Sequence, residues 1–230
     1  MTYSPPTSDT FTTPSPEAVA RIAACVERSQ QPSALTMMER LKPSLPNSQW
    51  YRDAKLGIES AFNALCRSEP SLLEGGKYVV EVGPGAGCFM IVAKALGNTV
   101  VGEELPLLPD GTWVQAYAEI ARFWGLHVRY YGFHRFLLDS NPEYVPESVD
   151  MFHFRGSLDG VLIPFKQDVD GAVERLVQLF VKYLKPGGEV RIAHNVDPLS
   201  TLAVEAFRKH HGPLVFTMDE PVVTRLVKPA

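Results

Sequence analysis

The stretch Lys77-Tyr-Val-Val-Glu-Val-Gly-Pro-Gly-Ala-Gly87 decides the fold, because a β-rich run breaks here into three alternating glycines. The nearly continuous apolar run before Gly83 is typical of a strand that is buried on both faces of a parallel sheet. Residues 88–96 are almost wholly apolar and are predicted to form a helix packed on that sheet. A glycine loop between a strand and a helix lets the backbone approach a ligand closely, and the helix start adds free N–H groups.

Strand and helix signals alternate from this point to the end of the chain. Parallel neighbours need crossover connections of this length, so the pattern predicts a doubly wound, mostly parallel α/β sheet with helices on both faces. A short last connection suits an antiparallel hairpin and brings the sheet to seven strands. Besides the first strand, strands are predicted at residues 98–102, 127–131, 148–154, 189–193, 214–217 and 222–227, and later helices at 113–124, 173–184 and 202–209.

The chain before this α/β region has a different character. Residues 1–15 are rich in Ser, Thr and Pro, which predicts a flexible tail. Residues 16–72 show helical periodicity without a strand signal and are predicted to form an N-terminal helical cap. Residues 73–230 then form the α/β domain. The cap helices are expected at residues 16–30, 33–41 and 48–68.

Composition narrows the class of protein. The 230 residues are 45% hydrophobic and 21% charged, and the net charge of −4 supplies no global field for a phosphate backbone, so we expect no nucleic-acid partner. No apolar run approaches the ~20 residues that cross a bilayer, so no membrane association is expected. The three cysteines form no CxxC pair, which favours a reducing, cytoplasmic setting without a disulfide scaffold or metal site.

Two common phosphate-binding loops do not match the glycine triplet. A dinucleotide fingerprint G-x-G-x-x-G would need a third glycine at Cys88 or at Met90, depending on the starting glycine. A P-loop would need Gly-Lys-Ser/Thr, whereas Gly87 precedes Cys88-Phe89. Both readings are disfavoured.

Val80-Glu-Val-Gly-Pro-Gly-Ala-Gly87 resembles motif I of the class I S-adenosylmethionine-dependent methyltransferases, (D/E)-x-G-x-G-x-G, at every specified position. Val101-Gly-Glu-Glu104 resembles the end of their second strand, Val149-Asp-Met-Phe-His-Phe-Arg-Gly-Ser-Leu158 their fourth strand and its loop, and Leu184-Lys-Pro-Gly-Gly188 the turn before their fifth strand. The resemblance covers residues 77–230 and not the cap. It implies a Rossmann-like methyltransferase fold and S-adenosylmethionine as cofactor.

The resemblance also implies which residues hold that cofactor. Glu104 would accept the ribose hydroxyls, with Glu103 as the alternative if the register is shifted by one residue. Where the family often has an adenine-binding Asp, this sequence has His134, so adenine would be read by His134 or by the backbone of residues 132–135. The remaining cofactor-binding candidates are Glu81, Gly83, Pro84, Gly85, Gly87, Phe154 and Arg155.

Catalytic and acceptor residues are less strongly marked. Ligands of open α/β sheets bind at the carboxyl ends of the strands, which nominates Ser157 on the acceptor side and His194 as the catalytic candidate, because histidine changes charge near neutral pH. In the cap, Trp50, Tyr51 and Arg52 combine an indole, a phenol and a guanidinium and are predicted to cover the acceptor. The alternative is that Trp50 anchors the cap to the sheet.

We therefore predict methyl transfer from S-adenosylmethionine to an oxygen or nitrogen of a small organic acceptor. The small size is inferred from the acidic charge balance and from the absence of an appended recognition domain. Two alternatives stay open: a protein that binds the cofactor without transferring methyl, and a methyltransferase that acts on a protein side chain. Oligomeric state is not predicted.

Overall fold

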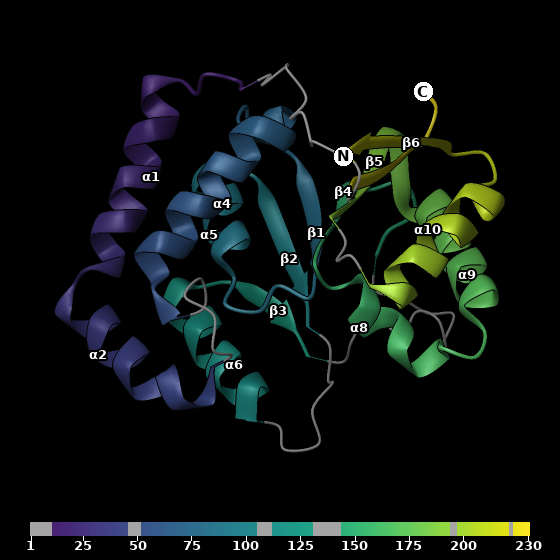
Figure 1. Ribbon diagram of the computed structural model, residues 1–230. Coiled ribbons are helices and arrows are strands. Elements are labelled where there is room, and N and C mark those ends of the chain that lie inside the picture. The colour runs from purple at the N-terminus through teal and green to yellow at the C-terminus, as the bar shows by residue number, and fades with distance from the viewer. Residues whose placement is uncertain (1–10, 46–51, 105–111, 131–143, 194–196, 221–222) are drawn as a thin grey trace, which may run out of the picture.

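The computed structural model describes residues 11–45, 52–104, 112–130, 144–193, 197–220 and 223–230, and these form a seven-stranded sheet between two layers of helices (Figure 1). The strand order is β3-β2-β1-β4-β5-β7-β6. Strands β1 to β5 are parallel, and β7 runs antiparallel to both β5 and β6. The predicted fold class is therefore confirmed. The strands are β1 Tyr78–Val82, β2 Thr99–Glu103, β3 His127–Arg129, β4 Val149–Arg155, β5 Leu184–Ala193, β6 Val215–Glu220 and β7 Val223–Val227.

Helices cover both faces of the sheet, each over a separate hydrophobic core (Figure 1). One face packs against α1 (Pro16–Ser29), α2 (Pro32–Leu41), α4 (Ala54–Ser68), α5 (Cys88–Ala95) and α6 (Thr112–Trp124). The other packs against α8 (Leu158–Leu162), α9 (Val169–Tyr183) and α10 (Pro198–His210). None of the helices within the described ranges is long and apolar enough to span a bilayer.

The cap helices share the core of the first face. Ile58 and Leu65 of α4 are fully buried in one cluster with Val79 of β1 and Met90 of α5. This packing uses the apolar stripe of α4, whose residues recur at helical spacing. The cap therefore forms one wall above the carboxyl end of β1.

Side-chain caps set the starts of two cap helices, and one of these starts differs from the sequence prediction. Ser15, predicted as part of the flexible tail, caps α1 by accepting a hydrogen bond from the Ala18 N–H at 3.1 Å. Asp53 caps α4 in the same way through the Leu56 N–H, so this helix begins at Ala54 and Arg52 precedes it. In both cases a side-chain oxygen satisfies a free N–H at the helix start. Helix α1 begins at the predicted residue, whereas α4 begins later than the predicted residue 48.

Strand β5 is longer than predicted, because the predicted turn at residues 185–188 lies inside it. Gly187 has a φ of 75°, and its N–H donates to the Lys228 carbonyl at 2.9 Å. The pairing with β4 shifts in register at this point. A glycine with left-handed backbone lets the strand bulge while pairing continues on its other side.

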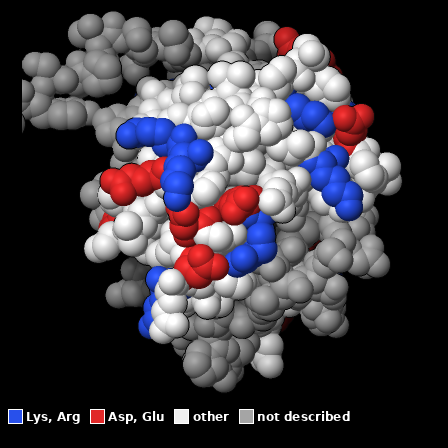
Figure 2. All heavy atoms as spheres, turned by 90° about the vertical axis from the view of Figure 1, so that its right-hand side faces the viewer, with Lys and Arg blue, Asp and Glu red and all other residues white. Residues whose placement is uncertain are grey.

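The outer surface on the side of α9 and α10 carries charged side chains of both signs, interspersed with uncharged ones (Figure 2). Lys209 of α10 and Asp170 of α9 form one ion pair there, at 2.6 Å. Exposed pairs of this kind contribute little stability. The layer is held instead by buried aromatic side chains, among them Phe154 of β4 and Phe180 of α9.

Candidate functional site

The glycine loop lies at the point where the strand order reverses. β1 pairs with β2 on one side and with β4 on the other. The helix that follows β1 covers one face of the sheet, and the helices that follow β4 cover the other. A crevice therefore opens at the carboxyl ends of β1 and β4, which is where ligands of open α/β sheets bind.

The three glycines of the loop have backbone that other residues rarely adopt. The φ angles are 69° at Gly83, 53° at Gly85 and 72° at Gly87. At Gly83, an added Cβ would also lie 2.5 Å from the Cβ of Ser157. The alternation of glycine in the sequence is thus required by left-handed backbone and, at Gly83, by close packing against the loop after β4.

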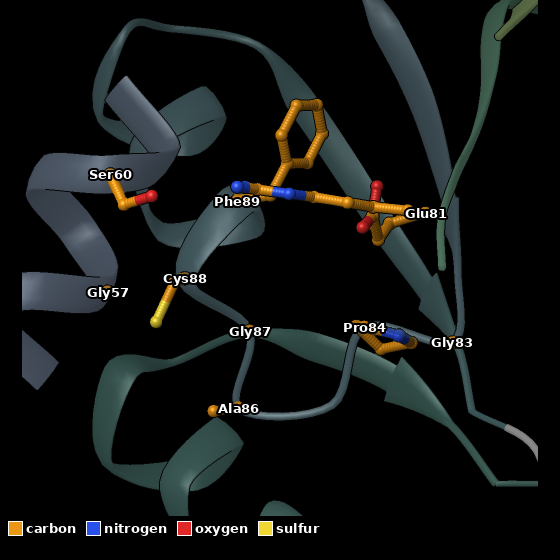
Figure 3. A pocket seen from close by; sticks show the side chains of 10 residues that line it. Gly57, Ser60, Glu81, Gly83, Pro84, Ala86, Gly87, Cys88 and Phe89 are labelled. Carbon is orange, nitrogen blue, oxygen red and sulfur yellow. The ribbon is translucent and has the colours of Figure 1, made fainter. Parts of the chain in front are cut away.

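A cavity of about 350 Å³ opens over this loop, within the ~300–1,000 Å³ typical of small-ligand sites. Gly57 and Ser60 of α4 form one wall and face Glu81 and Gly83 across the cavity (Figure 3). The cap therefore closes one side of the site. The remaining lining residues are Pro84, Ala86, Gly87, Cys88, Phe89 and Arg155.

Glu104 lies against the glycine loop. Its Oε2 accepts a hydrogen bond from the Gly85 N–H at 2.9 Å, and the residue is buried. The carboxylate of Glu103 is directed elsewhere: it accepts from the Tyr144 hydroxyl and lies 3.4 Å from Arg129 Nη1. Of the adjacent residues Glu103 and Glu104, it is Glu104 whose carboxylate contacts the glycine loop.

Tyr130, which the sequence analysis did not single out, follows β3 near Glu104. Burial, and then the charge of Glu104, raises the pKa of its phenol to about 12. Its hydroxyl is buried and has no hydrogen-bond partner among the described residues. A buried polar atom without a partner normally needs one, so this hydroxyl is available to a bound ligand.

Glu81 lines the cavity and is held from behind by a histidine. His153 Nδ1 lies 2.5 Å from Glu81 Oε2, and the ring of Phe89 stacks on the imidazole at 4.0 Å between centroids. The sequence analysis missed His153. A polar residue within the apolar run of a central strand was the available signal.

The other predicted residues of β4 and its loop divide between the cavity and the core. Arg155 lines the cavity. The Phe154 side chain is fully buried in the opposite core, because successive strand residues point to opposite faces. The Ser157 hydroxyl donates to the Val82 carbonyl and thereby fixes the loop. The roles of Phe154 in cofactor binding and of Ser157 on the acceptor side stay predictions.

Cys88 begins α5 at the edge of the cavity. Burial raises the pKa of its thiol to about 11, which outweighs the opposite influence of Arg155. A raised pKa disfavours the thiolate, so we assign Cys88 to the wall of the cavity.

Several predicted residues do not enter this description. His134, His194, Trp50 and Tyr51 lie outside the described residues, and their roles stay predictions. Arg52 donates to the Leu45 carbonyl at 3.4 Å and lines a separate cleft of about 620 Å³ between α1, α2 and α4.

Comparison with known proteins was informative only at the level of structure. No family model and no curated protein matches the sequence. A chain from the complex between the Haloferax volcanii Trm112 methyltransferase activator and the putative methyltransferase is similar, with a TM-score of 0.51 and 17% identity over 79% of this chain and 95% of that one. A S-adenosylmethionine-dependent methyltransferase of Aquifex aeolicus gives a TM-score of 0.47 and 14% identity over 83% and 96%.

The matches correct the prediction about partners. The T. thermophilus 16S rRNA N2 G1207 methyltransferase, in complex with AdoMet and guanosine, has a TM-score of 0.43 and 16% identity over 67% of this chain and 36% of that one. The prediction of no nucleic-acid partner does not hold, because a chain from an activator complex is among the matches and net charge was the only support for the prediction. Net charge sums the whole surface, whereas a nucleic acid responds to the local field of one patch. What the matches share with this chain is the architecture: it has the fold of the class I S-adenosylmethionine-dependent methyltransferases.

Proposed function

We propose that the protein binds S-adenosylmethionine at the glycine loop and transfers its methyl group to an oxygen or nitrogen acceptor. The observation that carries the proposal is the meeting of Glu104 with Gly85 at 2.9 Å. The glycine turn, which permits close approach of a ligand, follows β1, and the carboxylate, which can accept from a ribose diol, follows β2. The two meet beside the point where the strand order reverses.

The residues around this point fit the proposed cofactor. The Tyr130 hydroxyl, which has no hydrogen-bond partner among the described residues, and the Glu104 carboxylate supply a donor and an acceptor for the nucleoside. Glu81 and Arg155, which line the other end of the cavity, carry the charges that complement an ammonium and a carboxylate. When bound, S-adenosylmethionine supplies a methyl group on a positively charged sulfur. The protein's own part is to hold the reactants in line and to exclude water, for which α4 provides a wall.

The acceptor side rests on residues that follow the strands and on the cap. We propose His194 as the base for an acceptor that arrives protonated, and Trp50 and Tyr51 as the cover over the acceptor. Arg52 is not included, because it lines the separate cleft. A small organic molecule is the acceptor that we propose, and RNA is the other outcome of the test. Incubation with S-adenosylmethionine and either a panel of small hydroxyl and amino compounds or total RNA, followed by assay of S-adenosylhomocysteine, separates the two. Binding without product from any acceptor class would point to a cofactor-binding protein.

Replacing Glu104 with Ala is expected to weaken S-adenosylhomocysteine binding by about 2–3 kcal/mol, the size of losing charge-assisted hydrogen bonds. Isothermal titration calorimetry measures this directly. Glu103→Gln is the matched control, because Glu103 contacts Arg129 and Tyr144 and not the loop. If Glu104→Ala binds as tightly as the parent protein and Glu103→Gln loses affinity, the ribose is held by Glu103, and the assignment to Glu104 is wrong. If the parent protein takes up NADH and not S-adenosylhomocysteine, the proposed function fails.

A further inference from the structure

A row of buried charged side chains runs behind the candidate cofactor cavity. Glu81 of β1 stands opposite His153 of β4 in the parallel register, and His153 stands opposite Arg191 of β5. Glu69, which follows α4, reaches the row from the cap. The four residues are 2%, 3%, 6% and 5% exposed, in the order Glu81, His153, Arg191 and Glu69, and we refer to them as the buried charge row.

His153 is the centre of this row. Its Nδ1 lies 2.5 Å from Glu81 Oε2 and its Nε2 lies 3.5 Å from Glu69 Oε1. Arg191 Nε lies 2.5 Å from the same Glu69 oxygen. From α5, the neighbour is the uncharged ring of Phe89, which itself lines the cavity. His153 thus contacts two residues of the cavity wall without lining the cavity itself.

Stability alone does not account for such a row. Well-packed apolar residues of similar volume are commonly as stabilising as a buried ionic group, since desolvation offsets the attraction between the charges. Glu69 Oε2 is moreover buried without a hydrogen-bond partner among the described residues, which is a further cost. Charged groups kept at such a cost cluster at functional sites.

The charges of the row balance in two alternative ways. Behind the cavity, the carboxylates of Glu81 and Glu69 are offset by Arg191 and by one further positive charge. Arg155, which lines the cavity, is assigned to the ligand carboxylate and is not counted here. A proton on His153 supplies that further charge in the free protein. A ligand ammonium beside Glu81 would supply it in the complex, and the two positive charges would repel each other at this distance.

We propose that His153 is a positioning residue for the amino-acid end of the cofactor. Its Nδ1–H donates to one carboxylate oxygen of Glu81, so that the other carboxylate oxygen faces a ligand ammonium. Binding of that ammonium expels the proton on Nε2 of His153. This inference rests on the proposed function and adds to it a pH-dependent affinity set by a residue outside the cavity. The electrostatics agree with the geometry. Burial would lower the pKa of His153, but the carboxylates of Glu81 and Glu69 outweigh it and raise the pKa to about 9 in the free protein.

Two ligands test the proposal: S-adenosylhomocysteine carries the ammonium, and 5′-methylthioadenosine has the same nucleoside and a thioether without the amino-acid end. His153→Leu removes the donor to Glu81 and is expected to weaken S-adenosylhomocysteine about 10- to 100-fold, while 5′-methylthioadenosine changes less than about twofold. His153→Asn keeps an N–H donor in place of Nδ1 and is expected to restore most of the affinity.

Proton release gives a second readout that does not depend on a loss of affinity. Calorimetry at pH 8 in two buffers of different ionisation enthalpy is expected to show about one more proton released on S-adenosylhomocysteine binding by the parent protein than by His153→Asn. Relative to that variant, the affinity of the parent protein should rise from pH 7 to pH 9, because His153 is losing the competing proton over this range. The ligand's own amino group titrates equally in both proteins and cancels in the comparison.

The outcomes separate this inference from the proposed function. Equal losses of both ligands in His153→Leu, or equal proton release by the parent protein and His153→Asn, overturn the positioning role while the proposed cofactor site stands. A parent protein that binds neither ligand overturns the proposed function and this inference with it. If His153→Leu does not fold, the comparison with His153→Asn decides the matter alone.

Discussion

Gly85→Val is expected to reduce S-adenosylhomocysteine affinity by at least about 100-fold, or about 2.7 kcal/mol, while the protein remains folded. Gly85 has a φ of 53°, which a β-branched residue rarely adopts, and its N–H donates to Glu104. The new side chain would strain the loop and stand where the nucleoside must approach the backbone. Calorimetry measures the loss of affinity, and circular dichroism checks that the fold is retained.

Gly187→Val is the matched control for this change. Gly187 has a φ of 75°, and an added Cβ would meet no atom of the described residues within 4 Å. Both variants therefore carry the cost of left-handed backbone, of order 1–3 kcal/mol, but only Gly85 adjoins the cavity. Similar affinity losses in the two would mean that strain, and not contact with the ligand, explains the effect.

Arg191→Leu is expected to lower the free energy of unfolding by about 3–5 kcal/mol, because it leaves the Glu69 carboxylate buried without its closest cation. Urea denaturation followed by fluorescence measures the change. Adding Glu69→Gln to Arg191→Leu should recover part of the loss, because the uncompensated charge is then removed.

Arg225→Leu is the control for burial. Arg225 of β7 stands opposite Arg191 in the antiparallel register and pairs with Glu189, but its side chain is 41% exposed. Its partner Glu189 is 12% exposed, so the pair is half-buried, and this variant should lose clearly less stability than Arg191→Leu. Comparable losses at the two positions would show that the Arg191 effect comes from the sheet and not from the buried charge row.

The resemblance to motif I and the order of elements were sufficient to predict the sheet. The glycine loop, the strand runs and the helical stripes each have a local signature that tertiary contacts reinforced here. Strand ends were less certain: β3 ends at Arg129, and β5 begins at Leu184 because pairing continues through a turn-like sequence. Helix α4 begins later than predicted, because the Asp53 cap sets its start.

Glu104 illustrates what local sequence determined about the site. Its spacing from the glycine loop was enough to nominate it, and the alternation of side chains along β2 separates it from Glu103. The glycines themselves were equally predictable, because positive φ is a local property that only glycine adopts without strain.

The buried charge row could be decided only by the tertiary structure. Glu69, Glu81, His153 and Arg191 are far apart in the chain, and each alone looks like a polar residue in or beside an apolar run. Parallel pairing puts three of them in one line across β1, β4 and β5, and the cap adds the fourth. A sequence motif specifies the backbone conformation of a few consecutive residues. The partner of a buried charge is specified by strand register and by the packing of a cap outside the motif, which no local pattern carries.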